Sequence, residues 1–170
     1  MQQFAQQIQC SSAHILFLPE HDAKECATLS HSVHRLSYQF HWENPHIEDF
    51  TQWLSLFRAK TRKNIQVERK KAQQGVDRIY ALSGEELTPK HIDLMWSFYC
   101  DTIDRKWGRP YLTRDFFAML RTSLSANTLV FFAEKYGDIV ASSLCFQRGD
   151  HLFGRYWGCR GHIDFLHFEL

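Results

Sequence analysis

Residues 128–160 read TLVFFAEKYGDIVASSLCFQRGDHLFGRYWGCR and decide the fold. Two turn signals, residues 136–138 (YGD) and 148–150 (RGD), divide this stretch into three runs of strand length. Short connections that contain Gly and Asp favour tight turns between antiparallel strands. The stretch therefore predicts a three-strand antiparallel meander, and the residues after Gly158 are expected to begin a helix.

The residues before the meander predict one strand and two helices. Residues 76–82 have the composition of a strand, and Thr88 with Pro89 forms a favourable helix start. Thr113 caps a second predicted helix. A strand, two helices and three further strands predict an α/β fold with a mixed sheet and flanking helices.

The first part of the chain predicts shorter elements. Residues 14–18 form an apolar run typical of a buried strand, and residues 20–29 favour a helix. Residues 35–42 (RLSYQFHW) alternate apolar and polar side chains, as in a half-buried strand. A long helix is expected from residue 50 to about residue 74, with Gly75 as its C-terminal stop.

Composition excludes several classes of protein. The formal net charge of the 170 residues is +1, so no global field attracts DNA or a membrane surface. No apolar run is long enough for a transmembrane helix, and no leader pattern is present. The five cysteines are scattered and include no CxxC pair, which favours a reduced, cytoplasmic protein.

Residues 58–71 carry an uneven charge, with seven basic residues and a single acid, Glu68. Such a run can hold the phosphates of a nucleotide or tRNA, or it can be the solvated face of a helix. The anion-binding candidates are Arg62, Lys63, Arg69 and Lys70, together with Arg160 near the end of the meander.

Five segments carry a family resemblance. They are residues 38–44 (YQFHWEN), 62–71 (RKNIQVERKK), 104–113 (DRKWGRPYLT), 154–159 (GRYWGC) and 166–170 (LHFEL). In this order they resemble a bacterial family of predicted N-acyltransferases, the GNAT-like, FemAB-like group labelled peptidoglycan biosynthesis proteins. The resemblance covers residues 11–170, and members of the family are roughly twice as long. The chain is therefore expected to be a central fragment, incomplete at both ends.

The resemblance implies a GNAT-like organisation. Residues 1–57 would end a first GNAT-like lobe, residues 58–75 would form a basic connecting helix, and residues 76–170 would be a truncated second lobe. The implied activity is transfer of an acyl or aminoacyl group to an amine, in cell-wall peptidoglycan metabolism. The acceptor would be a small molecule or a cell-wall precursor. The oligomeric state is left open.

Acyl-CoA and aminoacyl-tRNA are the two donors that the resemblance implies, as substrates rather than tightly bound cofactors. In CoA-dependent relatives, a Gln/Arg-x-x-Gly-x-Gly/Ala loop at a helix N-terminus holds the pyrophosphate. Residues 158–163 read GCRGHI and lack this pattern, although Arg160 and Gly161 are present. The departure weakens the case for CoA, and the resemblance leaves aminoacyl-tRNA open as the donor, with tRNA as a possible partner.

The third strand of the meander supplies the first candidate site. Alternation predicts Tyr156 on one face and Arg155 with Trp157 on the other. Tyr156, the catalytic candidate, or Arg155 can orient a carbonyl, and Trp157 can contact substrate. Alternatively, Phe153, Arg155 and Trp157 form a cation–π ladder on the sheet.

His167 and Glu169 are further catalytic candidates, as base and orienter for an amine, or else they belong to an ordinary helix start. The other substrate-binding candidates are aromatic or cationic, and those after residue 105 can equally form a helix–helix corner. They are His41, Trp42, Lys106, Trp107 and Tyr111.

No metal site is predicted. Cys159-x-x-His162 and His31-x-x-His34 are each half of a zinc site without a second half. The alternative to an enzyme is a non-catalytic GNAT-like module that binds an anionic partner through the basic helix.

Overall fold

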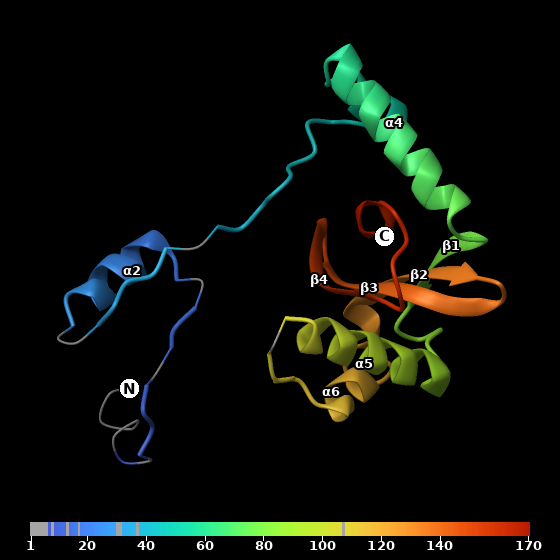
Figure 1. Ribbon diagram of the computed structural model, residues 1–170. Helices are drawn as coiled ribbons and strands as arrows, with labels where there is room; N and C mark the ends of the chain where they lie inside the picture. The colour runs from blue at the N-terminus through green and yellow to red at the C-terminus, as the bar shows by residue number, and fades with distance from the viewer. Residues whose placement is uncertain are drawn as a thin grey trace. The chain divides into compact units, whose positions relative to one another are not determined.

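The computed structural model describes residues 7, 9–12, 14–16, 18–29, 32–36, 38–106 and 108–170 (Figure 1). The chain divides into two compact units, Met1–His46 and Ile47–Leu170. Across the part of the chain that is described, no helix is long and apolar enough to cross a membrane. The division into GNAT-like lobes stays a prediction.

The N-terminal unit contains helix α2, Glu20–Ala27, which confirms the helix predicted there. The two strands predicted in this unit, at residues 14–18 and 35–42, are wrong, because their described residues have no strand structure. Phe17 and Ser37 within them lie outside the described residues. Alternation creates a strand only when a neighbouring strand takes up the backbone hydrogen bonds, and Phe40 is 98% exposed.

The second unit begins with two helices where one was predicted. Helix α3 spans Phe50–Ser55, and helix α4 spans Ala59–Gln74. The carboxylate of Asp49 caps α3 by accepting a hydrogen bond of 2.8 Å from the Gln52 N–H. Arg58 has an extended backbone (φ −60°, ψ 151°), so the helix is interrupted before α4 begins.

The sheet has four strands in the order β1-β2-β3-β4. They are β1 Arg78–Ser83, β2 Thr128–Lys135, β3 Asp138–Arg148 and β4 His151–Cys159. The predicted meander is confirmed with both of its turns. All three pairings are antiparallel, so the expected mixed sheet is not what these strands form. After β4, the expected helix start is a short 3₁₀ turn, η2 Leu166–Phe168.

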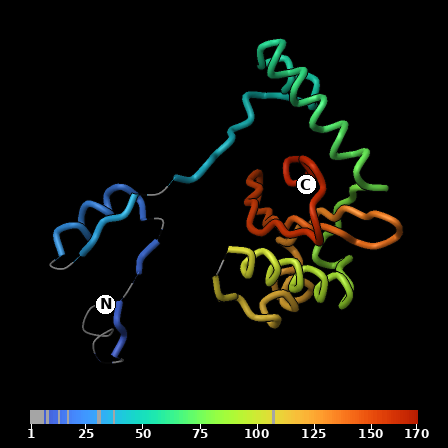
Figure 2. Tube along the Cα trace, viewed as in Figure 1, coloured from blue at the N-terminus to red at the C-terminus, as the bar shows by residue number. Residues whose placement is uncertain are grey.

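Helices α5 (Pro89–Asp104) and α6 (Arg114–Met119) cover one face of the sheet, and the C-terminal segment covers the other (Figures 1 and 2). Thr88 and Thr113 cap these helices as predicted, by accepting hydrogen bonds from backbone N–H groups. The core under α5 and α6 consists of Leu87, Ile92, Met95, Tyr99, Phe117, Leu120, Val130, Phe132 and Leu144. The smaller core on the opposite face consists of Val76, Ala133, Ala141, Cys159 and Leu166.

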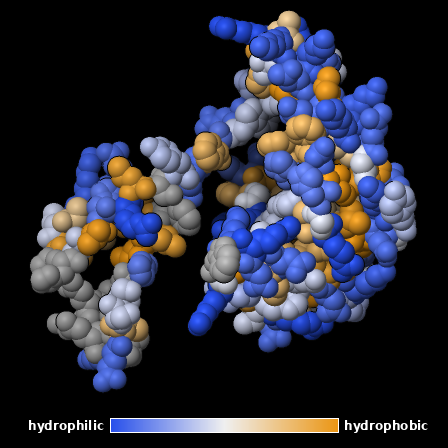
Figure 3. Space-filling view, in the orientation of Figure 1, coloured by the Kyte–Doolittle hydropathy of each residue, from blue (hydrophilic) through white to orange (hydrophobic). Residues whose placement is uncertain are grey.

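The surface of α4 is predominantly hydrophilic (Figure 3). Of its residues, only Ala72 is buried. The helix therefore lies at the surface of the unit, where its many charged side chains can remain in contact with water.

Candidate functional site

Strand β4 is an edge strand with a bulge. Tyr156 pairs with Leu144, and Gly154 pairs with Cys145, so Arg155 has no counterpart on β3. Bulges twist the strand locally and redirect side chains, and they are frequent at sheet edges beside active sites. The predicted cation–π ladder along β4 is not formed, because the Arg155 guanidinium lies over the Tyr156 ring at 5.1 Å.

Helix α5 lies against β4 at Gly158. A Cβ atom at Gly158 would come within 2.7 Å of the Phe98 carbonyl oxygen, so no side chain fits there. Thr102 donates a hydrogen bond to the Trp157 carbonyl, and Arg105 donates one to the Cys159 carbonyl, both at 3.4 Å. The C-terminal half of α5 is thus anchored along the outer edge of the sheet.

Three tyrosines meet at this edge, and we call them the tyrosine cluster: Tyr99 from α5, Tyr111 from the loop after α5, and Tyr156 from β4. The Tyr111 and Tyr156 hydroxyls are hydrogen-bonded to each other. The Tyr99 hydroxyl accepts from the backbone N–H groups of Tyr111 at 3.1 Å and Leu112 at 3.2 Å. The Tyr99 and Tyr156 rings pack edge to face at 5.1 Å. The loop candidate Tyr111 and the strand candidate Tyr156 are therefore brought together.

Sequence reasoning missed Tyr99 as a member of the site. It lies on the apolar face of α5 and is only 3% exposed, so its pattern is that of a core residue. The signal that could have identified Tyr99 is its hydroxyl group, because a buried tyrosine hydroxyl requires a hydrogen-bond partner.

The pKa of Tyr156 is raised above its ordinary value, first by burial and then by the hydrogen bond with Tyr111. The Arg155 charge acts in the opposite direction but is the weaker effect. The phenol therefore stays protonated at neutral pH and is a hydrogen-bond donor rather than a base. Two phenols share one hydrogen bond, so one O–H of the pair remains available to a ligand.

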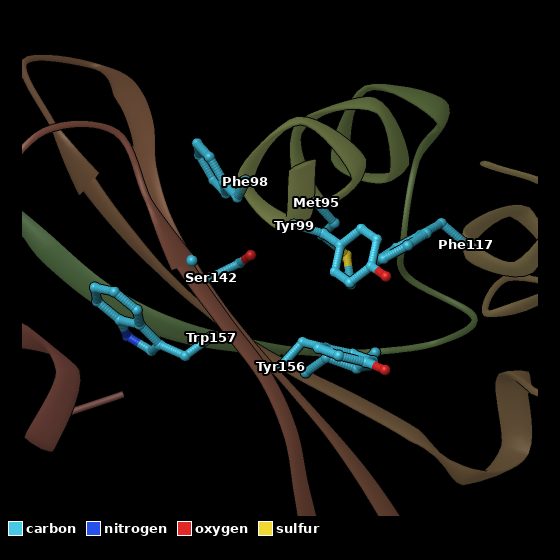
Figure 4. A pocket seen from close by; sticks show the side chains of 9 residues that line it. Met95, Phe98, Tyr99, Phe117, Ser142, Tyr156 and Trp157 are labelled. Atoms are coloured by element: carbon cyan, nitrogen blue, oxygen red, sulfur yellow. The ribbon is translucent and has the colours of Figure 1, made fainter. Parts of the chain in front are cut away.

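A small cavity lies between α5 and β4 beside this cluster (Figure 4). The Tyr99 and Tyr156 hydroxyls point to one side of it, and the indole of Trp157 lies on the other. Its volume is about 10 Å³, which is room for about one water molecule. A substrate must therefore lie outside this cavity, where Tyr111 is 64% exposed.

Comparison with protein families supplies the context. A family model described as FemAB-like, peptidoglycan biosynthesis/recognition, matches residues 1–170. The chain belongs to the FemAB-like family. Among curated proteins, none matches it. The family resemblance carried by the five sequence segments is thereby confirmed, and it associates the chain with peptidoglycan biosynthesis or recognition.

His167 and Glu169 of this FemAB-like chain do not form a pair with each other. The His167 ring packs edge-on against Trp157, with 6.0 Å between ring centroids. The Glu169 carboxylate accepts a hydrogen bond of 2.8 Å from the Gln73 amide and forms an ion pair with Arg69 at 3.3 Å. Glu169 is thus bound to α4.

The remaining candidates are dispersed. Lys106 is exposed next to Trp107, which lies outside the described residues. His41 and Trp42 belong to the N-terminal unit, where the His41 ring is 3.2 Å from the Gln39 amide oxygen and Trp42 is 62% exposed. Among the anion-binding candidates, the exposed ones are Lys63, Lys70 and Arg160, and the half-buried ones are Arg62 and Arg69.

The two metal half-sites show other contacts. The Cys159 thiol donates to the Gly161 carbonyl at 3.1 Å, and the His162 ring is 2.8 Å from the Asp164 carboxylate. Within the described residues, no three His, Cys, Asp or Glu side chains are grouped to hold a metal ion. His31 lies outside these residues.

Proposed function

We propose that this FemAB-like chain is part of an N-acyltransferase with GNAT-like lobes. It transfers an acyl or aminoacyl group to an amine in peptidoglycan metabolism. The observation that carries the proposal is the tyrosine cluster on a bulged edge strand, which joins the two sequence candidates Tyr111 and Tyr156. Family membership supports the metabolic context.

In the proposed reaction, the amine nitrogen attacks the acyl carbonyl carbon. A C–N bond forms, and the bond from that carbon to the ester oxygen of tRNA or the thioester sulfur of CoA breaks. The amine loses one proton, and the leaving group gains one. The free O–H of the tyrosine pair donates to the carbonyl oxygen as negative charge develops on it, and outward-facing N–H groups of β4 can do the same.

Several groups of the chain would position the reactants. Arg155 and Lys106 are exposed cations near the β4 edge and the loop after α5, and they suit an anionic part of either substrate. The indole N–H of Trp157 is buried and has no hydrogen-bond partner among the described residues. An unpaired buried donor costs free energy, so an acceptor atom brought to it would be stabilising. His167 remains the candidate base, since Glu169 is occupied by Gln73 and Arg69.

The donor is tested by incubating the complete enzyme of which this chain is part with radiolabelled aminoacyl-tRNA or acyl-CoA and a panel of primary amines. The absence of the pyrophosphate loop pattern in residues 158–163 favours aminoacyl-tRNA. We expect label to appear in an amide product from this donor. If the complete enzyme of which this chain is part transfers from neither donor, the proposal is contradicted.

A second candidate function is a binding module without catalysis. Lys60, Lys63 and Lys70 are exposed on α4, and none of them forms an ion pair with another described residue. A single-stranded nucleic acid would then bind with a steep dependence on salt. Each Lys→Gln substitution should reduce the slope of log K against log[salt] by about 0.7. Such binding in the absence of any acyl transfer would favour this function.

A further inference from the structure

A second, larger cavity lies between α3, α4 and the C-terminal segment. Its volume is about 280 Å³, close to the lower end of the range for small-molecule sites. It is lined by Phe50, Trp53, Ile65, Glu68, Arg69, Phe165, Phe168 and Glu169. We call it the aromatic cage. None of these residues lines the cavity beside the tyrosine cluster, so the two sites are separate.

The walls of the cage already interact with cations. The Arg69 guanidinium lies 4.1 Å from the Phe50 ring centroid, and the Lys71 ammonium lies 5.6 Å from that of Phe165. Phe50 and Trp53 are stacked at 5.3 Å, which fixes the orientation of their rings. Ring faces attract cations through the aromatic quadrupole, and Trp and Phe are effective at these distances.

The charge of the lining also favours a cation. Arg69 is paired with Glu169, so these two charges balance. Glu68 lines the cage, is half-buried, and has no hydrogen bond or ion pair with any described residue. Among the residues that line the cage, Glu68 is therefore a carboxylate without a paired cation in the described part of the chain.

Lys71 lies over Phe165 at the cage wall, but it is exposed and forms no ion pair with Glu68 or any other described residue. With 3.6 residues per turn, Ile65, Glu68 and Arg69 share one face of the helix. Lys63 and Lys70 lie on the opposite, exposed face and do not line the cage. Their field is screened by solvent, whereas Glu68 lies in the cage wall.

Phe165 occupies a strained backbone conformation at the cage wall. Its φ is 61°, in the left-handed region that bulky residues rarely adopt. Such a conformation costs free energy, and backbone strain of this kind is common at ligand sites. The strained residue is thus one whose aromatic ring lines the cage.

We propose that the aromatic cage is a binding site for an organic ammonium ion on an aliphatic stem, held by the faces of Phe50, Trp53 and Phe168 and by the Glu68 carboxylate. The site goes beyond acyl transfer, because binding there needs no acyl donor. Its success or failure is therefore measured independently of the proposed reaction.

The test is an NMR titration of the ¹⁵N-labelled full chain with n-butylammonium chloride, followed at the Trp53 indole N–H. The signal is assigned by its loss in Trp53→Phe. We expect saturable shifts with n-butylammonium and at least about five-fold weaker binding of n-pentanol and butyrate. Equal binding of n-pentanol would show that the cavity selects apolar ligands without regard to charge. Tighter binding of butyrate would show that it is an anion site. Either result overturns the proposal.

Two substitutions on α4 sharpen the test because their effects have opposite signs. Glu68→Gln should weaken n-butylammonium binding about five- to ten-fold, since it removes the charge and keeps the shape. Arg69→Met should strengthen it several-fold, because it removes the internal cation from Phe50 and leaves Glu169 bound to Gln73. An anion site predicts the reverse for both. Glu85→Gln, an exposed carboxylate outside the cage, is the control and should change nothing.

Discussion

Strand β4 and residues 35–42 carry similar sequence signals and have different structures. Both combine Arg, Tyr and Trp with aromatic residues at alternating positions. β4 pairs with β3 at every residue except the bulged Arg155, whereas the described part of residues 35–42 has no strand structure. The difference teaches that alternation describes which side chains can face a core, and that a strand also needs a partner for its backbone.

Burial follows the same division. Phe132 on β2 is 0% exposed and lies in the core under α5 and α6, whereas Phe40 is 98% exposed. The sheet thus obtains its stability from packing that residues 35–42 do not share. The first three predictions below each compare a residue that makes a close contact with a residue that lacks it.

The largest expected effect is that of removing a core aromatic ring. Phe132→Ala should lower the free energy of unfolding by about 3–5 kcal/mol, because it leaves a cavity in the core. Phe40→Ala should change it by less than about 0.5 kcal/mol. Urea unfolding monitored by circular dichroism measures both. A large loss in Phe40→Ala would mean that residues 35–42 do pack against a core.

The second comparison uses two glycines of β4. Gly158→Ala should destabilise the fold by about 1–3 kcal/mol, because its Cβ would overlap the Phe98 backbone on α5. Gly154→Ala is the matched control, since nothing lies within 4 Å of its Cβ position. The readout is the urea midpoint. Equal midpoints for the two variants would contradict the close approach of α5 to β4.

The third comparison concerns tyrosine hydroxyls. Tyr111→Phe removes the hydrogen bond to Tyr156 and should cost about 1 kcal/mol. Tyr38→Phe, in the exposed segment, should be neutral, because Tyr38 is 89% exposed. Thermal unfolding in parallel gives both values. If Tyr111→Phe were as stable as the native chain, the hydrogen bond between the two hydroxyls would not contribute to the free energy of unfolding.

The smallest effect is a pH dependence at the start of α5. Burial, together with the Lys90 charge, lowers the pKa of His91, whose neutral ring accepts a hydrogen bond of 3.0 Å from the Thr88 N–H. Below the ordinary pKa of about 6.5, the unfolded chain therefore binds more protons at His91 than the folded chain does. The stabilisation that the neutral ring contributes is present above that pH and is lost as the pH falls through the lowered pKa.

His91→Gln tests this dependence, because Gln at the same position can still complete the capping box. Urea unfolding between pH 5 and about pH 7.5 should show a smaller acid loss in the variant than in the native chain. Identical pH profiles would exclude His91 as the source.

Local chemistry made much of the fold predictable. Turn residues 136–138 and 148–150 defined the meander, and Thr88 and Thr113 marked the helix starts, because caps and turns depend on a few adjacent residues. The family was also recognisable from short segments. By contrast, the antiparallel sheet and the missing strand at residues 35–42 depend on which strands find partners.

The site was less predictable for the same physical reason. Arg155 becomes the bulged residue only through the register with β3, and period two alone placed it beside Trp157. Tyr99 resembles any core residue until the loop after α5 folds back to it. His167 and Glu169 are close in sequence, yet Glu169 contacts Gln73, which is distant in the chain.

The tyrosine cluster on β4 is proposed to take part in acyl transfer, and the most direct measurement is the transfer rate of Tyr156→Phe in the complete enzyme. Tyr80→Phe is the control, because Tyr80 is also half-buried against the same core and lies on β1, at the other edge of the sheet. We predict a rate at least about 100-fold lower in Tyr156→Phe, as for loss of a donor to a developing oxyanion, and an unchanged rate in Tyr80→Phe. A native rate in Tyr156→Phe, or an equal loss in both variants, would contradict it.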